Sequence, residues 1–253
     1  MGNSNIVRNK SGRISDAIIG EMSSLYDIKQ SLHLARFFKT GEGEYGEGDH
    51  FLGIKVPVTR ALVKKYRKDI SIVDIIKLID SEWHEIRLAG FLLLLELYKF
   101  SLKEKDTEQT KFLVNFYLVN IEKGNNWDLV DLVSEFILGD WILRNPGNEK
   151  ILLELADKEG FLWHQRVAIV STLTLIRAGQ FDLTFQIAEK FLCHSHDLIH
   201  KATGWMLREV GKKGGKEELI KFLEKHKSTM PRTMLRYAIE RFSEEERKYF
   251  MKK

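Results

Sequence analysis

The sequence predicts an all-α protein, an α-solenoid of HEAT-like helical repeats with a concave basic groove. Apolar residues recur at helical spacing along most of the chain, and no convincing alternating strand pattern occurs. A charged residue also returns every 35 residues from Asp131 to Arg166, Lys201 and Arg236. Paired helices that recur at such a period are typical of helical solenoids. The tryptophan and proline spacing of tetratricopeptide repeats is absent, which favours the HEAT-like class.

The predicted helices follow one another with short linkers. Ser31 is a plausible cap, and Pro57 suits a first helical turn. Glycines at 124, 147, 160, 179 and 214–215 suit helix C-termini. Residues 1–12 are expected to form a flexible N-terminal tail, and residues 13–253 a single HEAT-like repeat domain. The helices are expected at 14–26, 32–38, 57–68, 71–80, 84–99, 105–122, 127–138, 147–158, 162–177, 182–192, 197–212, 216–226, 231–242 and 243–251.

Composition indicates a folded, helix-rich chain. Of its 253 residues, 43% are hydrophobic and 30% charged, and only three are proline. No apolar run reaches the ~18 residues that cross a membrane. One cysteine, Cys193, excludes an intrachain disulfide, and the polar N-terminus carries no secretory signal, so a cytoplasmic location is expected. The net charge of +4 is too small to indicate nucleic-acid binding by itself.

The glycine- and acid-rich stretch 41–49 is interpreted as a structural loop. It formally matches the G-x-G-x-x-G pattern of dinucleotide-binding proteins. However, no strand precedes it, and its carboxylates would repel a pyrophosphate. No cofactor is therefore expected here, although the sequence leaves the role of this loop open.

The repeat around Lys201 has two distinct faces. An apolar face is formed by Ile199, Ala202, Met206 and Val210, while a neighbouring stripe reads Lys201, Trp205, Arg208 and Lys212. In a solenoid, equivalent helices lie side by side, which would place Arg166, Lys201 and Arg236 in a row about 10 Å apart. Such a row can follow a phosphate backbone. Alternatively, these charges are solvated or pair with acids of neighbouring helices.

Asp131 is the one acid at this repeated position. The upstream segment Arg87-Leu88-Ala89 resembles the repeated segments, and it too carries a cation. Trp127 precedes it by one helical turn and shares its helix face. Two interpretations stay open. Asp131 is either a structural partner of Arg166 in the next repeat, or a catalytic carboxylate that stabilises positive charge during a reaction.

Several segments resemble the bacterial DNA alkylation-repair glycosylases of the AlkD type, which are built from HEAT-like repeats. They are Ala35 to Lys39, Phe51 to Pro57, Asn126 to Asp131, Trp163 to Arg166, and Lys201 to Glu209. The resemblance spans about residues 15–245. It implies excision of N3- or N7-alkylated purines from duplex DNA. It also implies a catalytic Asp131, with Arg166, Trp127 and Trp205 lining the lesion site.

One carboxylate is enough for this chemistry. A glycosidase usually needs an acid to protonate its leaving group, whereas an alkylated purine is already cationic. An anion about 4 Å from the developing sugar cation contributes roughly 1–4 kcal/mol, or about one to three powers of ten in rate. The tryptophans could contact the cation, and Arg166 could hold a phosphate.

Two other groups of residues, a cluster of cysteine and histidine and a set of tryptophans, have a different interpretation. Cys193, His194, His196 and His200 lie close together in sequence, but they straddle a predicted helix start, so no metal site is expected. Trp83, Trp141 and Trp163 are expected to pack between helices. Two alternatives to the glycosylase remain: a non-catalytic DNA-binding relative and a protein-interaction scaffold. The expected partner is double-stranded DNA with alkylated purines. No membrane association is expected, and the protein is expected to be a monomer.

Overall fold

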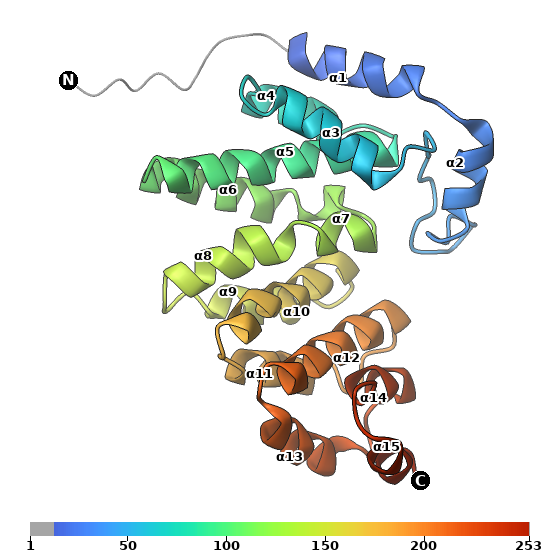
Figure 1. Cartoon of the computed structure of the whole chain (residues 1–253), viewed down its shortest axis with the longest axis vertical. Coiled ribbons are helices and arrows are strands. Elements are labelled where there is room, and N and C mark those ends of the chain that lie inside the picture. Colours follow the sequence, from blue (N-terminus) through green and yellow to red (C-terminus); the bar gives the residue numbers. More distant parts are fainter. Residues whose placement is uncertain (1–12, 253) are drawn as a thin grey trace. The chain divides into compact units, whose positions relative to one another are not determined.

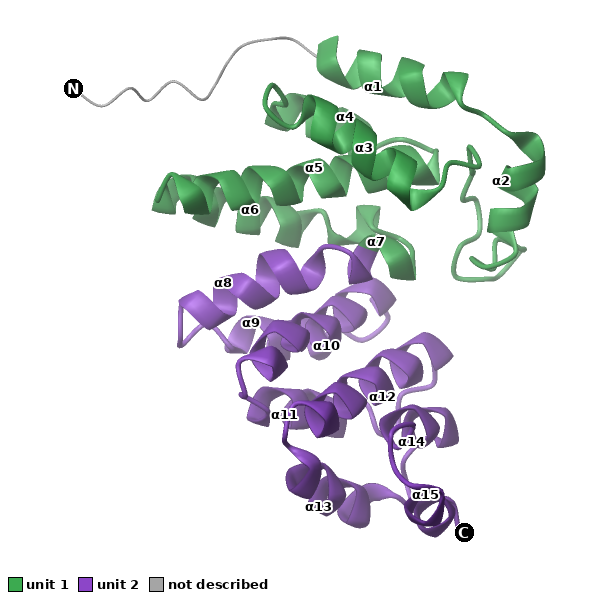
Figure 2. Ribbon diagram, viewed as in Figure 1, with its two compact units in different colours: residues 1–129 green, residues 130–253 purple. Residues whose placement is uncertain are grey.

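The computed structural model describes residues 13–252, whose regular structure is helical throughout. The described residues fall into two compact units, which contain residues 13–129 and 130–252 (Figure 2). A backbone bridge between His50 and Trp83 lies outside the helices. The all-α class predicted from the periodicity is confirmed. The tail predicted for residues 1–12 lies outside the described residues, and the single repeat domain over 13–253 stays a prediction.

Unit 1 is organised around the longest helix of the described chain, α5 (His84–Lys103). Its residues from 84 to 95 are all buried, so other elements cover it on every side. Helices α3, α4 and α6 pack against it, and α1 packs on α4 (Figure 1). The other helices of this unit are α1 (Arg13–Ser24), α2 (Ile28–Ala35), α3 (Val56–Tyr66), α4 (Ile72–Ile79) and α6 (Thr107–Val119), and a 3₁₀ turn follows at Ile121–Lys123.

Unit 2 is organised around α10 (Leu162–Arg177) and α12 (Asp197–Lys212), which pack against each other. Helices α9 and α11 pack on α10, and α13 and α14 pack on α12 (Figure 1). The remaining elements are a π-helix (Glu135–Gly139), α8 (Asp140–Arg144), α9 (Lys150–Ala156), α11 (Asp182–Lys190), α13 (Lys216–His226), α14 (Arg232–Ala238) and α15 (Glu244–Met251).

The 35-residue period of the sequence is visible in the positions of the helix starts. Helix α7 (Trp127–Asp131) begins at residue 127, α10 at 162, α12 at 197 and α14 at 232. Asp131, Arg166, Lys201 and Arg236 are therefore each the fifth residue of their helix. Equivalent side chains in a helical repeat take equivalent places. The repeat architecture predicted from the sequence is thus confirmed at the level of the helices.

The single helix predicted over residues 127–138 is wrong in form. Helix α7 ends at Asp131, and the chain then runs through the π-helix into α8 as far as Arg144. Gly139 lies inside this helical run and does not end it. A glycine is needed there for packing, since a Cβ atom would clash with the backbone oxygen of Ser171 on α10. The interruption directly follows the predicted catalytic residue, and π-helical turns are frequent at functional sites.

Candidate functional site

Asp131 and Arg166 form a bidentate ion pair within unit 2. The Nε and Nη2 atoms of Arg166 donate to the two carboxylate oxygens of Asp131 at 2.9 and 2.7 Å. The third nitrogen, Nη1, donates to the backbone oxygen of Leu198, at the start of α12, at 2.7 Å. The pairing of neighbouring repeats, which the sequence offered as one alternative, is therefore present. Arg166 fixes the orientation of the carboxylate plane through two parallel hydrogen bonds.

The two partners differ in their access to solvent. The Arg166 side chain is 6% exposed and that of Asp131 15% exposed. The carboxylate is thus held in one orientation by Arg166, and part of its side chain is exposed to solvent. Such a group can act on a cation outside the helix bundle, which a carboxylate sealed in the core could not do.

A second carboxyl group, Glu135, lies one helical turn beyond Asp131. It is buried and pairs with Arg177 near the end of α10. Burial raises the pKa of Glu135 above its usual value, Arg177 opposes this, and the charge of Asp131 adds to the rise. The surroundings of Glu135 therefore favour its neutral form more than is usual for a glutamate.

Lys201 and Arg236 line one open depression of about 560 Å³ on unit 2. Its other lining residues are Asp197, Thr233, Tyr237 and Glu240. Lys201 is 41% exposed and pairs with Asp197 at 2.6 Å, while exposed Arg236 donates to the Thr233 hydroxyl at 3.4 Å. Two of the predicted DNA-contacting cations are thus brought together. The acids between them make the depression mixed in charge rather than uniformly basic.

The stripe that continues along α12 is also partly neutralised. Glu209 accepts from Arg208 at 3.3 Å and from Lys212 at 2.7 Å, and Arg208 also pairs with Glu240 of unit 2. Lys212 is exposed, whereas Trp205 is half-buried on the same helix. The alternative in which repeat cations pair with nearby acids therefore holds for part of this stripe. A contact of these residues with DNA stays a prediction.

Arg87, the upstream cation of similar sequence context, does not share the surface position of Lys201 and Arg236. Its guanidinium is buried and pairs with Asp49 of the loop 41–49. It also donates to the Ser81 backbone oxygen and to the Asn125 side chain, both at 2.9 Å. α5 starts at residue 84, so Arg87 is its fourth residue and is out of register with the 35-residue series. Its role in unit 1 is to tie the loop to α5.

Trp127 belongs to an aromatic stack in unit 1. Its ring centroid lies 5.4 Å from that of Phe38, with 17° between the planes. Phe38 in turn stacks on Phe51 at 4.9 Å, and Phe51 stacks on His84 at 4.6 Å. The indole is half-buried. One face of Trp127 is therefore taken by Phe38, and its position depends on the rings behind it.

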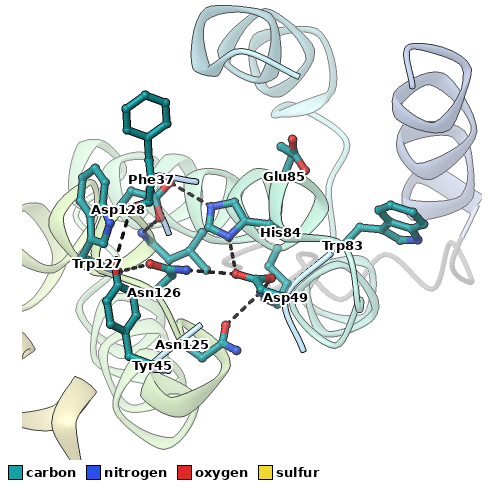
Figure 3. Close-up of polar contacts among 12 residues, drawn as sticks. Phe37, Tyr45, Asp49, Trp83, His84, Glu85, Asn125, Asn126, Trp127 and Asp128 are labelled. Atoms are coloured by element: carbon teal, nitrogen blue, oxygen red, sulfur yellow. Dashed lines mark hydrogen bonds and ion pairs between the residues drawn. The ribbon is translucent and has the colours of Figure 1, made fainter. Parts of the chain in front are cut away.

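His84 stands at the centre of a buried polar network (Figure 3). Its Nδ1 lies 2.8 Å from Asp49 and its Nε2 lies 2.9 Å from Asp128, while the side chain is only 2% exposed. Asn126 adds a hydrogen bond of 3.1 Å from its amide to Asp49. Helix α5, the loop 41–49 and the start of α7 are thus joined by one imidazole.

The charges of this network support one another. Burial lowers the pKa of His84, but the charges and hydrogen bonds of Asp128 and Asp49 outweigh it and raise that pKa to about 9. Burial raises the pKa of Asp49, and His84 and Arg87 together bring it below its usual value. Only a protonated imidazole donates from both nitrogens. The arrangement is therefore a cation held between two carboxylates at neutral pH.

Sequence reasoning did not find Asp49, His84, Glu85 or Asp128. Glu85 accepts three backbone N–H groups, from Leu52, Gly53 and Ile54, at 2.8 to 3.0 Å, and so anchors the segment after the loop. The structural-loop interpretation of 41–49 is supported, because its glutamates accept N–H groups of the loop itself. The available signal was the loop itself, where acids alternate with glycines.

The histidine-rich turn before α12 is held by hydrogen bonds. His194 contacts the Gln165 side chain at 2.9 Å, and the His196 ring accepts the Leu198 N–H at 3.1 Å. Burial, together with the charges of His200 and His196, lowers the pKa of His194. Within residues 13–252, no group of three or more His, Cys, Asp or Glu could hold a metal ion. Nor does any helix in this range have the length and apolarity needed to span a membrane.

Comparisons with known proteins identify the family of the chain and a solved structure of the same fold. The family described as "DNA alkylation repair enzyme" matches residues 18–242. A solved structure titled "Predicted DNA alkylation repair enzyme from Enterococcus faecalis" superposes with a TM-score of 0.66 at 17% sequence identity. The match covers 87% of this chain and 97% of that one, which shows a shared fold. A search of curated proteins gave no match.

Proposed function

The chain belongs to the DNA alkylation repair enzyme family, and on this premise we propose that it is a DNA glycosylase. The proposed reaction is hydrolysis of the N-glycosidic bond of cationic N3- or N7-alkylated purines in duplex DNA. The observation that carries the proposal is the Asp131 carboxylate, which Arg166 orients through two hydrogen bonds and whose side chain is partly exposed to solvent. Family membership itself indicates a DNA repair enzyme with DNA as its partner.

The chemistry asks for one anion. When the glycosidic bond of an alkylated purine breaks, both bonding electrons go to the cationic base, which leaves neutral. Positive charge then develops on the sugar, and a water molecule adds to C1′ and loses a proton. Asp131 would stabilise the sugar cation and hold the water. No group has to protonate the leaving base, in contrast to ordinary glycoside hydrolysis.

The expected contribution of Asp131 follows from its surroundings. A unit charge about 4 Å away contributes roughly 1 kcal/mol in water and roughly 4 kcal/mol near a protein surface. The neighbouring Arg166 cation reduces the net field. It also holds the carboxylate in place before the reaction, so no reorganisation is needed as the charge develops. A rate effect of about one to three powers of ten is therefore expected.

DNA binding is assigned to the cations and tryptophans of the predicted site. Lys201, Arg236 and Lys212 carry exposed charges that can contact phosphates, and Arg208 is proposed to assist them. Trp205 is proposed to contact the lesion nucleotide through its ring face, as is Trp127. A phosphate contact by Arg166 stays a prediction, since three of its N–H donors are engaged within the protein.

Base release from methylated DNA tests the proposal. The wild-type protein is expected to release 7-methylguanine or 3-methyladenine, and Asp131→Asn to do so about 10- to 1,000-fold more slowly. Asp140→Asn is a matched control: Asp140 is also ion-paired to an arginine, Arg144 at 2.7 Å, and belongs to the following helix. Equal rates for Asp131→Asn and the wild type would refute the catalytic assignment.

A non-catalytic DNA-binding relative is the second candidate. The observation that favours it is again the ion pair, because a carboxylate engaged with Arg166 can serve packing alone. A non-catalytic relative would bind duplex DNA without releasing a base. A protein-interaction scaffold would show no duplex affinity, and salt titration separates it from both, since DNA affinity falls steeply with salt. A monomeric state and a cytoplasmic location complete the proposal.

A further inference from the structure

The segment that carries Trp127 is anchored by the residue on each side of it. Asn126 accepts the Trp127 backbone N–H at 2.9 Å and donates to Asp49 at 3.1 Å. Asp128 contacts the Nε2 atom of His84 at 2.9 Å. Two tethers therefore run from the backbone of Trp127 to the same buried pair, Asp49 and His84. The start of α7 cannot move without breaking one of them.

The indole is held from behind by the same histidine. Phe38 lies between His84, at a centroid distance of 4.8 Å, and Trp127, at 5.4 Å. Phe51 stacks on both Phe38 and His84. His84 thus supports the ring on which the indole rests and also binds the residue next to it in the chain. Few other side chains could do both, because the task needs a flat ring and two N–H donors.

The loop 41–49 contributes Asp49 to the support of Trp127. Asp49 accepts from His84, Arg87 and Asn126, although it is itself buried. Gly46 lets the loop approach the Phe38 segment, since a Cβ atom there would clash with the Phe38 backbone oxygen. The loop therefore packs against the segment that carries the Phe38 ring. It does so with a charge that only a cationic partner can balance in a buried place.

From this geometry we propose that His84 is a positioning residue for Trp127, and that the loop 41–49 exerts its effect on the lesion site through Asp49 and His84. The inference deepens the proposed function and rests on it, since Trp127 is there assigned to contact the lesion nucleotide. His84 touches no substrate. Its effect is to keep the indole at one place and angle, where a displacement of 1 Å can cost about 100-fold in rate.

The experiment uses the full chain with His84→Gln, which removes the cation and retains one amide donor. The first readout is acrylamide quenching of Trp127 fluorescence, obtained as the difference between each protein and its Trp127→Phe counterpart. Quenching is expected to rise at least about twofold in His84→Gln, because the indole loses its support. The second readout is base release, where kcat is expected to fall about 10- to 100-fold while DNA affinity changes less than about threefold.

Asp74→Asn is the control variant. Asp74 is another fully buried carboxylate of unit 1, and it accepts backbone N–H groups from Ser15 and Ser71. No contact links it to Trp127, so its loss tests general destabilisation of the unit. Unchanged quenching and kcat are expected for this variant. Equal effects of Asp74→Asn and His84→Gln would overturn the proposal, as would a folded His84→Gln protein that behaves like the wild type.

A milder variant serves if His84→Gln does not fold. Asp128→Asn removes one carboxylate charge and leaves the contact between His84 and Asp49 intact, so a smaller change of the same sign is expected. An Asp128→Asn protein with unaltered quenching would then refute the proposal. Failure of the proposed function can be told apart from failure of this proposal. A wild-type protein that releases no base overturns the glycosylase assignment, whereas the quenching of Trp127 fluorescence still shows whether His84 positions Trp127.

Discussion

Raising the pH from 6.5 to 9 is expected to loosen the loop 41–49 from α5. The groups that face His84 are Asp49 on the loop, Asp128 on α7 and, through Asp49, Arg87 on α5. The pKa of His84 is raised from 6.5 to about 9. A raised pKa means that the folded state binds the proton more tightly than the unfolded state, so the contribution of His84 to stability is largest at low pH and is lost as the pH rises.

The magnitude follows from the size of the shift. From 6.5 to about 9 is about 2.5 pH units, and each unit corresponds to 1.36 kcal/mol. About 3 kcal/mol is therefore present in full below pH 6.5 and is lost as the pH rises through 9. Above that pH a neutral imidazole can donate to only one of the two carboxylates, and the other faces a lone pair.

Hydrogen exchange of the whole chain, followed by mass spectrometry, measures this loss locally. After correction for the intrinsic effect of pH, protection of residues 41–54 is expected to fall about 100-fold between pH 6.5 and 9. Helix α9, which contains no histidine, serves as internal reference. The His84→Gln protein should show no such dependence. Constant protection of 41–54 in the wild type would refute the reasoning.

Two further predictions concern unit 2. Lys201→Ala and Arg236→Ala are each expected to weaken duplex binding and to reduce the slope of log affinity against log salt by about one, with little change in the urea midpoint; a large loss of stability would mean that these side chains are structural. Gly204→Ala is expected to destabilise the protein by about 1–3 kcal/mol in urea unfolding, because the new Cβ would meet Met234 and Tyr237 of α14 at 2.5 Å; unaltered stability would show that α12 and α14 can move apart.

The repeat could be predicted because it is periodic. Apolar spacing shows each helix within a short window of sequence, and the fixed interval of 35 residues from Asp131 to Arg236 shows that the helical unit recurs. The interval also brought out the pairing of Asp131 with Arg166 as one alternative, and the structure contains that pair. What the interval does not decide is whether the carboxylate acts in catalysis, because packing and chemistry use the same ion pair.

The His84 network could not be predicted because it follows no period. Its partners lie on a loop and on a different helix, and the contacts do not recur with the 35-residue repeat. The break in the predicted helix 127–138 has a similar cause. No glycine or proline interrupts residues 127–138; instead, the hydroxyls of Ser171 and Thr174 donate to the backbone oxygens of Ser134 and Glu135. Side chains from another helix thus replace the pairing that a continuous α-helix would supply.

The contact of one protonated imidazole, that of His84, with the two carboxylates of Asp49 and Asp128 has a consequence for evolution. If a mutation replaces His84 with a neutral residue, Asp49 keeps the Arg87 cation, and both Asp49 and Asp128 lose the charge of His84 in a buried place. Loss of a single acid likewise leaves the histidine half-satisfied. Concerted change at these three positions is therefore expected: homologous chains should keep the three residues together or lose them together, along with the glycine-rich loop that carries Asp49.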